Sequence, residues 1–276
     1  MLHNRNEVPA TMEERPINAY IKNDNGFQYI EEGEGEVLLL LHGLFGTLSN
    51  WKEVLRVFSK DYRVIIPLLP IYHLPPEKTT VAGLNEFVYE FSKYKKLAPA
   101  ILIGNSLGGH VALYHALEYP ENVKALVLTG SSGLYENTMG SSFVRRSDYD
   151  FIKARVEMTF YDPKVATPDL VNEVYQTVND NSKVIKILSM ARSAMRQNLR
   201  ETIKNIDKPV CLIWGRNDII TPEEVGQEFH QLLPNSELHF IDKCGHAPMM
   251  EHPQEFNRIL RDFLQRHTFS ISSHDR

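Results

Sequence analysis

The sequence predicts an α/β fold: a mostly parallel central sheet flanked by helices, with a helical cap inserted after the sixth strand. Short apolar runs alternate with helical patterns over residues 17–132 and 206–267, which we expect to form the core. Between residues 133 and 205 the alternation stops and only helical patterns remain, so this segment is the expected cap. The 276 residues suit one large domain with an insertion.

Composition excludes several classes of protein. Hydrophobic residues make up 42% and charged residues 24%, which are ordinary values for a soluble domain. A net charge of -5 with no basic run argues against a nucleic-acid partner. Cys211 and Cys244 are too few for a disulfide framework, and we expect both to be small buried side chains.

We expect neither a signal peptide nor a membrane span in this sequence. Residues 1–16 are polar, lack the apolar core of a signal peptide and are expected to be a flexible leader, as residues 268–276 are expected to be a loose tail. The longest apolar run, residues 37–41, is far too short to span a bilayer. We therefore expect a cytoplasmic protein without a membrane partner, while its oligomeric state stays open.

The first half of the chain begins with strands. Residues 17–22 and 27–32 flank an Asn-Asp-Asn-Gly turn, which predicts an antiparallel hairpin. Residues 37–41 are continuously apolar, as in a parallel strand covered on both faces. The following elements are predicted to be a helix at 51–58, a strand at 62–66, a proline-rich loop at 67–76, a helix at 80–94, a strand at 101–103, a helix ending at 119 and a strand at 123–128.

The second half begins with the cap. Its predicted helices span residues 151–160, 170–178 and 184–195, and Thr167 with Pro168 predicts the start of the second one. The core pattern then resumes with a strand at 210–214, a helix, a strand at 238–241 and a final amphipathic helix around residues 256–264. We expect a capping box, Thr221 to Glu224, to start the first of these helices.

The candidate nucleophile lies between the fifth strand and the helix behind it, in Gly104-Asn105-Ser106-Leu107-Gly108. This is the G-x-S-x-G pattern of a nucleophile elbow, a strained turn that exposes the serine hydroxyl. The two glycines suit a place where strand and helix backbones nearly touch. The competing interpretation is that Ser106 is an ordinary helix N-cap.

A serine becomes a nucleophile at neutral pH when a base takes its proton and a carboxylate orients that base. Asp218 follows the strand at 210–214, and His246 follows the strand at 238–241. Because parallel strands end at one edge of a sheet, both residues should lie near Ser106. Two alternatives stay open: Asp218 pairs with Arg216 instead, or Asp242 is the acid.

The chain resembles the α/β-hydrolase superfamily over nearly all of residues 17–266. The resemblance is carried by HGLFG at 42–46, GNSLGG at 104–109, WGRND at 214–218 and CGHAP at 244–248, in the order that this superfamily shows. It implies a Ser106-Asp218-His246 triad and no cofactor. It also implies an oxyanion hole from the N–H groups of Leu107 and Leu44, with Phe45 as the alternative to Leu44, and a structural role for His42.

The expected activity is hydrolysis of small carboxylic esters through an acyl-enzyme, so the expected partner is a small acyl substrate. A serine at the elbow disfavours haloalkane dehalogenases and epoxide hydrolases, whose elbow carries an aspartate. No H-E-x-x-H, P-loop or G-x-G-x-x-G motif is present, so no metal or nucleotide site is expected. The alternatives are a carbon–carbon hydrolase of the meta-cleavage-product type and a non-enzymatic ligand sensor on the same fold.

Two segments limit what the resemblance implies about the substrate. The usual D-x-P-G-x-G after the fourth strand is replaced by Leu68-Leu69-Pro70-Ile71-Tyr72-His73. The substrate pocket is expected to be lined by five residues from the loops and the cap, although Met and Phe at helical spacing also suit the interior of the cap. These five residues are Phe45, Asn105, Phe143, Met158 and Met190.

Overall fold

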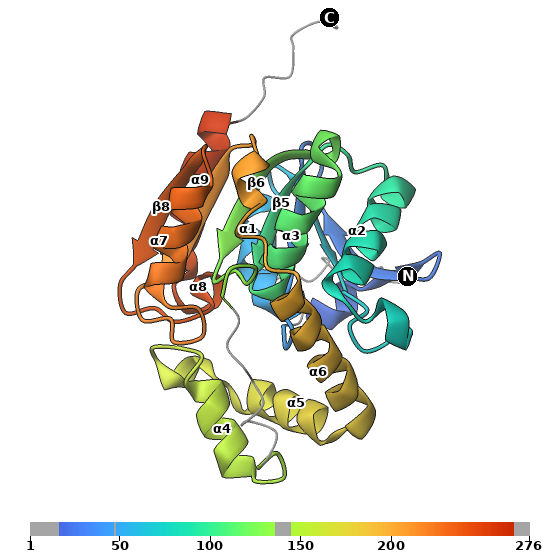
Figure 1. The fold of residues 1–276 in the computed structure, drawn as a ribbon, viewed down its shortest axis with the longest axis vertical. Coiled ribbons are helices and arrows are strands. Elements are labelled where there is room, and N and C mark those ends of the chain that lie inside the picture. Colours follow the sequence, from blue (N-terminus) through green and yellow to red (C-terminus); the bar gives the residue numbers. More distant parts are fainter. Residues whose placement is uncertain (1–16, 47, 136–144, 268–276) are drawn as a thin grey trace, which may run out of the picture.

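The computed structural model describes residues 17–46, 48–135 and 145–267. The expected leader, the expected tail and Phe143 lie outside these ranges. Within them the strands form one eight-stranded sheet in the order β1-β2-β4-β3-β5-β6-β7-β8 (Figure 1). β2 pairs antiparallel with both β1 and β4, and all other pairs are parallel. The α/β architecture predicted from the sequence is confirmed.

The strands agree closely with the predicted ones. β3, β5 and β7 are buried along their whole length, because helices cover both faces of the sheet. The strand bounds are β1 Lys22–Asp24, β2 Phe27–Glu32, β3 Val37–Leu41, β4 Arg63–Pro67, β5 Ala100–Asn105, β6 Val123–Thr129, β7 Val210–Gly215 and β8 Ser236–Ile241.

The first predicted strand is partly wrong. Ile17–Tyr20 forms a 3₁₀ helix, and β1 begins only at Lys22. Ile17 and Tyr20 both pack against the apolar core, and the three-residue period of a 3₁₀ helix places them on one side. The hairpin turn is also tighter than predicted, since Asn25 and Gly26 carry its positive φ angles of 49° and 81°.

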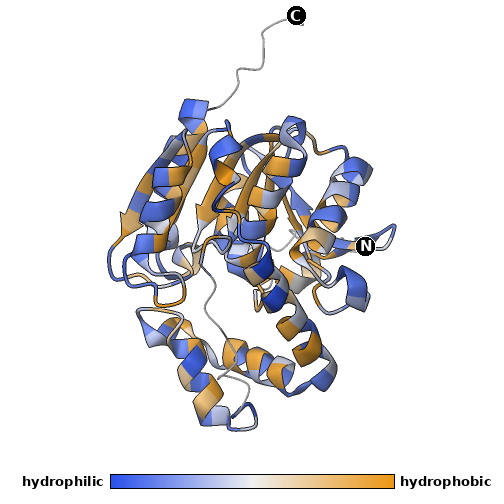
Figure 2. Cartoon of the chain, viewed as in Figure 1, coloured by the Kyte–Doolittle hydropathy of each residue, from blue (hydrophilic) through white to orange (hydrophobic). Residues whose placement is uncertain are grey.

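Helices cover the sheet in two layers. Their bounds are α1 Lys52–Phe58, α2 Val81–Lys95, α3 Leu107–Glu118, α4 Tyr149–Glu157, α5 Pro168–Asn179, α6 Asn181–Arg196, α7 Glu223–Leu232, α8 Pro248–Glu251 and α9 Pro253–His267. α2, α3 and α7 pack on the sheet face that contains Leu39, and α1 and α9 on the face that contains Leu38. Successive strand side chains point to opposite faces, so each central strand contributes to both cores. Figure 2 shows the strands as mainly hydrophobic.

Three helices, α4 to α6, follow β6 and precede β7, as the sequence predicts for the cap. In Figure 1 α4 and α5 lie beyond the arrowhead ends of the strands, whereas α6 runs back to α2, whose Val81 N–H donates to the Ser193 hydroxyl at 3.1 Å. Thr167 is the N-cap of α5, and its hydroxyl accepts a 3.3 Å hydrogen bond from the Leu170 N–H. The assignment of residues 133–205 to a separate domain stays a prediction.

None of the helices in the described ranges combines the length and apolar character needed to cross a bilayer. Cys211 and Cys244 are both free and buried, as predicted.

Candidate active site

Ser106 lies in a strained turn between β5 and α3. Its φ of 54° and ψ of -119° are unusual for a residue other than glycine. Although Ser106 occupies the N-cap position of α3, its side chain makes no capping hydrogen bond, so the interpretation as an ordinary N-cap is wrong. The neighbouring glycines are required by close approach: a Cβ on Gly108 would lie 2.1 Å from the Leu41 carbonyl oxygen.

The predicted acid and base lie together at the ends of β7 and β8. His246 Nδ1 and Asp218 Oδ2 are 2.8 Å apart, and both residues are buried, with exposed fractions of 8% and 4%. An ionised carboxylate can only accept, so Nδ1–H is the donor. This bond selects the imidazole tautomer in which Nε2 is free to accept a proton.

The structure does not show either alternative for the acid, a pair between Asp218 and Arg216 or a bond between Asp242 and the histidine. Arg216 contacts Asp242 Oδ1 at 2.6 Å and Glu223 Oε2 at 3.1 Å rather than Asp218. The Asp242 side chain is 79% exposed to solvent. Asp218 is therefore the carboxylate that the structure brings to the histidine.

Asp218 receives further hydrogen bonds from the segment that follows it. Its Oδ1 accepts from the N–H groups of Ile220 at 2.8 Å and Thr221 at 3.0 Å, and its Oδ2 accepts from the Thr221 hydroxyl at 2.8 Å. The predicted capping box is wrong, because α7 begins at Glu223 behind Pro222, which provides no side-chain cap. An aspartate whose side chain bonds the N–H two residues ahead forms an Asx turn. The tendency of aspartate to form such turns is the feature of the sequence that could have indicated the contact between Asp218 and Thr221.

Asn105 connects the elbow to the histidine loop. Its Nδ2 donates to the carbonyl oxygens of Thr129 at 3.0 Å and His246 at 3.1 Å. The imidazole also lies against Gly130, where a Cβ would be 2.8 Å from Nδ1. In the described part of the chain the ring is hydrogen-bonded to Asp218 and Thr221, and not to the Ser106 hydroxyl. Such bonds are often long before substrate binds.

The loop after β3 borders the nucleophile, since a Cβ on Gly43 would lie 3.1 Å from Ser106 Cβ. His42 is buried in this loop; its Nδ1–H donates to the Gly43 carbonyl at 2.9 Å, and its Nε2 accepts from the Leu69 N–H at 3.0 Å. Burial lowers the pKa of His42 to about 4, so the ring is neutral. The structural role expected for His42 agrees with these contacts.

The remaining predicted residues are spread over core and cap. Leu107 is the first residue of α3 and is buried, and Phe45 is half-buried against the core face that contains Leu38. Met190 is fully buried in α6, whereas Met158 is 48% exposed just after α4. The oxyanion-hole roles of Leu44 and Leu107 and the pocket roles of Phe45, Asn105, Met158 and Met190 stay predictions.

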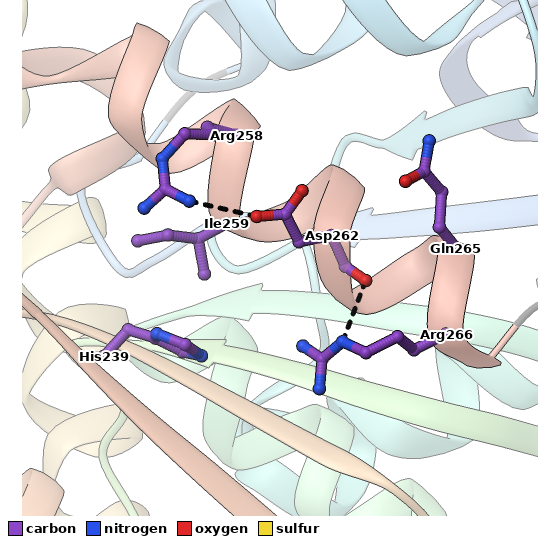
Figure 3. Close-up of a pocket in the computed structure, with 6 residues that line it drawn as sticks. All are labelled: His239, Arg258, Ile259, Asp262, Gln265 and Arg266. Atoms are coloured by element: carbon purple, nitrogen blue, oxygen red, sulfur yellow. Dashed lines mark hydrogen bonds and ion pairs between the residues drawn. The ribbon is translucent and has the colours of Figure 1, made fainter.

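Away from these residues, Cys211, Glu237 and His239 bring possible metal ligands within 4.8 Å of one another. Arg266 already holds both Glu237 oxygens, at 2.6 and 2.7 Å, and burial raises the pKa of the Cys211 thiol. A guanidinium and a protonated thiol disfavour a cation at this place. Figure 3 shows the adjacent pocket between His239 and α9, which contains none of the predicted site residues.

Comparisons with known proteins support the α/β-hydrolase fold. A family model described as alpha/beta hydrolase fold matches residues 36–253. A 2-hydroxy-6-oxononadienedioate/2-hydroxy-6-oxononatrienedioate hydrolase of Paraburkholderia phymatum is 30% identical over 86% of this chain and 90% of its own length. A similar hydrolase of Comamonas testosteroni is 28% identical over 85% and 89%.

Among solved structures, an alpha/beta hydrolase enzyme from the metagenome of lagoon sediments at Mar Chica, Morocco, is 41% identical. The alignment covers 90% of this chain and 99% of that one, with a TM-score of 0.76. The chain therefore belongs to the α/β-hydrolase fold family.

Proposed function

We propose that this hydrolase cleaves small, uncharged carboxylic esters through an acyl-enzyme on Ser106. The observation that carries the proposal is the buried 2.8 Å bond between His246 and Asp218, which lies at the sheet edge where the strained elbow presents Ser106. A nucleophile with an oriented base is the arrangement that acyl transfer requires.

In this mechanism His246 Nε2 takes the proton of Ser106 as the hydroxyl oxygen attacks the ester carbonyl. Asp218 holds the imidazole and stabilises the imidazolium that forms. The N–H of Leu107 and a second N–H, that of Leu44 or of Phe45, receive the developing oxyanion. The imidazolium then protonates the departing alcohol, and water activated by His246 releases the acid from Ser106.

The distribution of charge favours an uncharged acyl group. In the part of the chain that the structure describes, no lysine or arginine is among the buried residues. On cap helix α6, the Lys186 ammonium is already bound to the Leu74 carbonyl and the Thr79 hydroxyl, and the Lys183 ammonium lies over the Tyr72 ring. Buried carboxylates need a paired cation, so a substrate with carboxylates deep in the site is disfavoured.

The second candidate is carbon–carbon hydrolysis, because the curated relatives at 28–30% identity are named as hydrolases of dienedioates. The test is a panel of p-nitrophenyl esters of graded acyl length together with a 2-hydroxy-6-oxo-dienedioate. We expect the highest kcat/KM on a short ester, with multiple turnovers, and loss of that activity in Ser106→Ala. A higher kcat/KM on the dienedioate would overturn the ester assignment in favour of the second candidate.

The same panel of esters distinguishes an enzyme from a non-enzymatic ligand sensor on the same fold. Reaction with a fluorophosphonate does not distinguish an enzyme from a sensor, since both can carry a reactive serine. Many turnovers per chain on any member of the panel favour the enzyme. A single acylation without release of the acid would instead favour the sensor.

A further inference from the structure

The loop that departs from the family pattern, residues 68–73, lies against residues 42–46, which we call the oxyanion loop. The Leu69 N–H donates to His42 Nε2 at 3.0 Å, and the Tyr72 hydroxyl donates to the Leu44 carbonyl at 3.1 Å. Ile71, between them, is 1% exposed and anchors the loop in the core. The loop therefore contacts the oxyanion loop at two places rather than passing over it.

These contacts fix two consecutive peptide groups. His42 Nδ1–H holds the Gly43 carbonyl, whose peptide carries the Leu44 N–H, and Tyr72 holds the Leu44 carbonyl, whose peptide carries the Phe45 N–H. In a planar trans peptide the C=O and N–H point in opposite directions, so fixing the oxygen also fixes the N–H. The two N–H groups fixed in this way are the two candidates for the second oxyanion donor.

The chain also keeps the Tyr72 hydroxyl in place and protonated. Lys186 Nζ of α6 donates to the Leu74 carbonyl at 2.5 Å, which ties the end of the loop to the cap. Lys183 Nζ, one turn earlier on α6, lies 5.4 Å from the centre of the Tyr72 ring. Burial raises the pKa of Tyr72 to about 12, so the hydroxyl remains a donor at neutral pH.

We propose that Tyr72 is a positioning residue: by holding the Leu44 carbonyl it fixes the peptide that carries the Phe45 N–H, the alternative second oxyanion donor, next to the Leu44 N–H. This inference rests on the proposed function of Ser106 and extends it to a residue outside the triad. Preorganised donors act on the transition state more than on the ground state, so the effect should appear in kcat rather than in KM.

The test is Tyr72→Phe, which keeps the ring and its contact with Lys183 and removes only the hydroxyl. On the p-nitrophenyl ester preferred by the wild type, we expect kcat to fall about 3- to 10-fold, the loss of one neutral hydrogen bond, with KM within about twofold. The matched control is Tyr94→Phe, because the Tyr94 hydroxyl bonds Asp24 in the N-terminal hairpin. The control should keep the kcat of the wild type.

A second readout separates positioning from general loss of structure. An alkyl trifluoromethyl ketone accepts the Ser106 oxygen at its carbonyl carbon, the carbonyl electron pair moves to oxygen, and the serine proton passes to His246. Its inhibition constant should rise in Tyr72→Phe by the same factor by which kcat/KM falls. An unchanged inhibition constant and an unchanged kcat would overturn the role of Tyr72.

Failure of the proposed role of Tyr72 and failure of the proposed function give different results. If the wild type hydrolyses the ester and Ser106→Ala does not, the function stands and Tyr72→Phe alone decides the inference. If the wild type neither hydrolyses esters nor binds the trifluoromethyl ketone, the function itself fails.

Discussion

The core and the cap of this hydrolase differ in how tightly their side chains are constrained. In the core, β3, β5 and β7 are buried throughout, and Asn105 and Asp218 both bond His246 from other parts of the chain. The cap segment instead exposes several large apolar side chains: Tyr149, Met158, Tyr161 and Ile185. The proposed chemistry therefore lies where neighbouring elements determine the position of the side chains.

The two regions meet at the histidine loop. The His246 N–H donates to the Thr159 carbonyl of the cap at 2.8 Å. The Glu251 carboxylate of α8 accepts from the N–H groups of Gly245 and Asp162, both at 2.6 Å. The cap is thus attached to the core beside the proposed base, where its position bears on the orientation of the imidazole.

The largest effect is expected at the most constrained residue of the core. Ser106→Ala should lower kcat on the preferred ester by roughly 10⁴–10⁶, because members of a triad act as a unit. Steady-state kinetics measure the loss, and a thermal unfolding curve close to that of the wild type is the control for folding. Activity near the wild-type value would show that another group is the nucleophile.

Within the cap, two methionines of equal size test the comparison directly. Met190→Ala should lower the free energy of unfolding by about 2–5 kcal/mol, because Met190 is fully buried and leaves a cavity. Met158→Ala should change it by less than about 0.5 kcal/mol, because Met158 is 48% exposed. Urea unfolding measures both variants. Equal losses would mean that an exposed side chain of the cap is as constrained as one that packs against the core.

A buried histidine of the core should make stability depend on pH. His115 is hydrogen-bonded to Asn85 at 2.7 Å, and burial lowers its pKa from 6.5 to about 4. Between these two values the unfolded chain binds the proton first, so the free energy of unfolding should fall as pH decreases from about 6.5 to about 4. In His115→Gln this fall should be smaller by up to about 3 kcal/mol, measured by urea unfolding at each pH. His42 and His110, with the same shift, leave a residual slope.

A smaller loss of activity than in Ser106→Ala is expected at Thr221, whose hydroxyl donates to the Asp218 carboxylate. Thr221→Val keeps the shape of the side chain and removes the donor to Asp218 Oδ2. A hydrogen bond to a charged group contributes about 1.5–3 kcal/mol, so kcat/KM should fall about 10- to 100-fold. The ester assay measures this change. If kcat/KM stays unchanged, the backbone bonds to Oδ1 are sufficient to hold the carboxylate.

Sequence reasoning succeeded where one physical rule sufficed. Continuously apolar strands alternating with helices require a parallel sheet, and parallel strands end at one edge, so Asp218 and His246 could be placed together before any coordinates. It failed for Ile17–Tyr20 and for Thr221, where the local pattern suits two structures equally well. For Ile17–Tyr20, packing against the apolar core decides between them, and for Thr221 the Asx turn of Asp218, three residues earlier, does.

The amino-acid sequence by itself determined the α/β-hydrolase fold and the order of its motifs, because hydrophobic periodicity and glycines at close approaches are local properties of the chain. Only the tertiary structure decided that Thr221 supports Asp218, that Asn105 holds the histidine loop and that Tyr72 reaches the oxyanion loop. The bond from Asn105 to His246 spans 141 residues, and the bond from Tyr72 to Leu44 spans 28. Hydrogen bonds of this kind exist only once folding has brought those segments together.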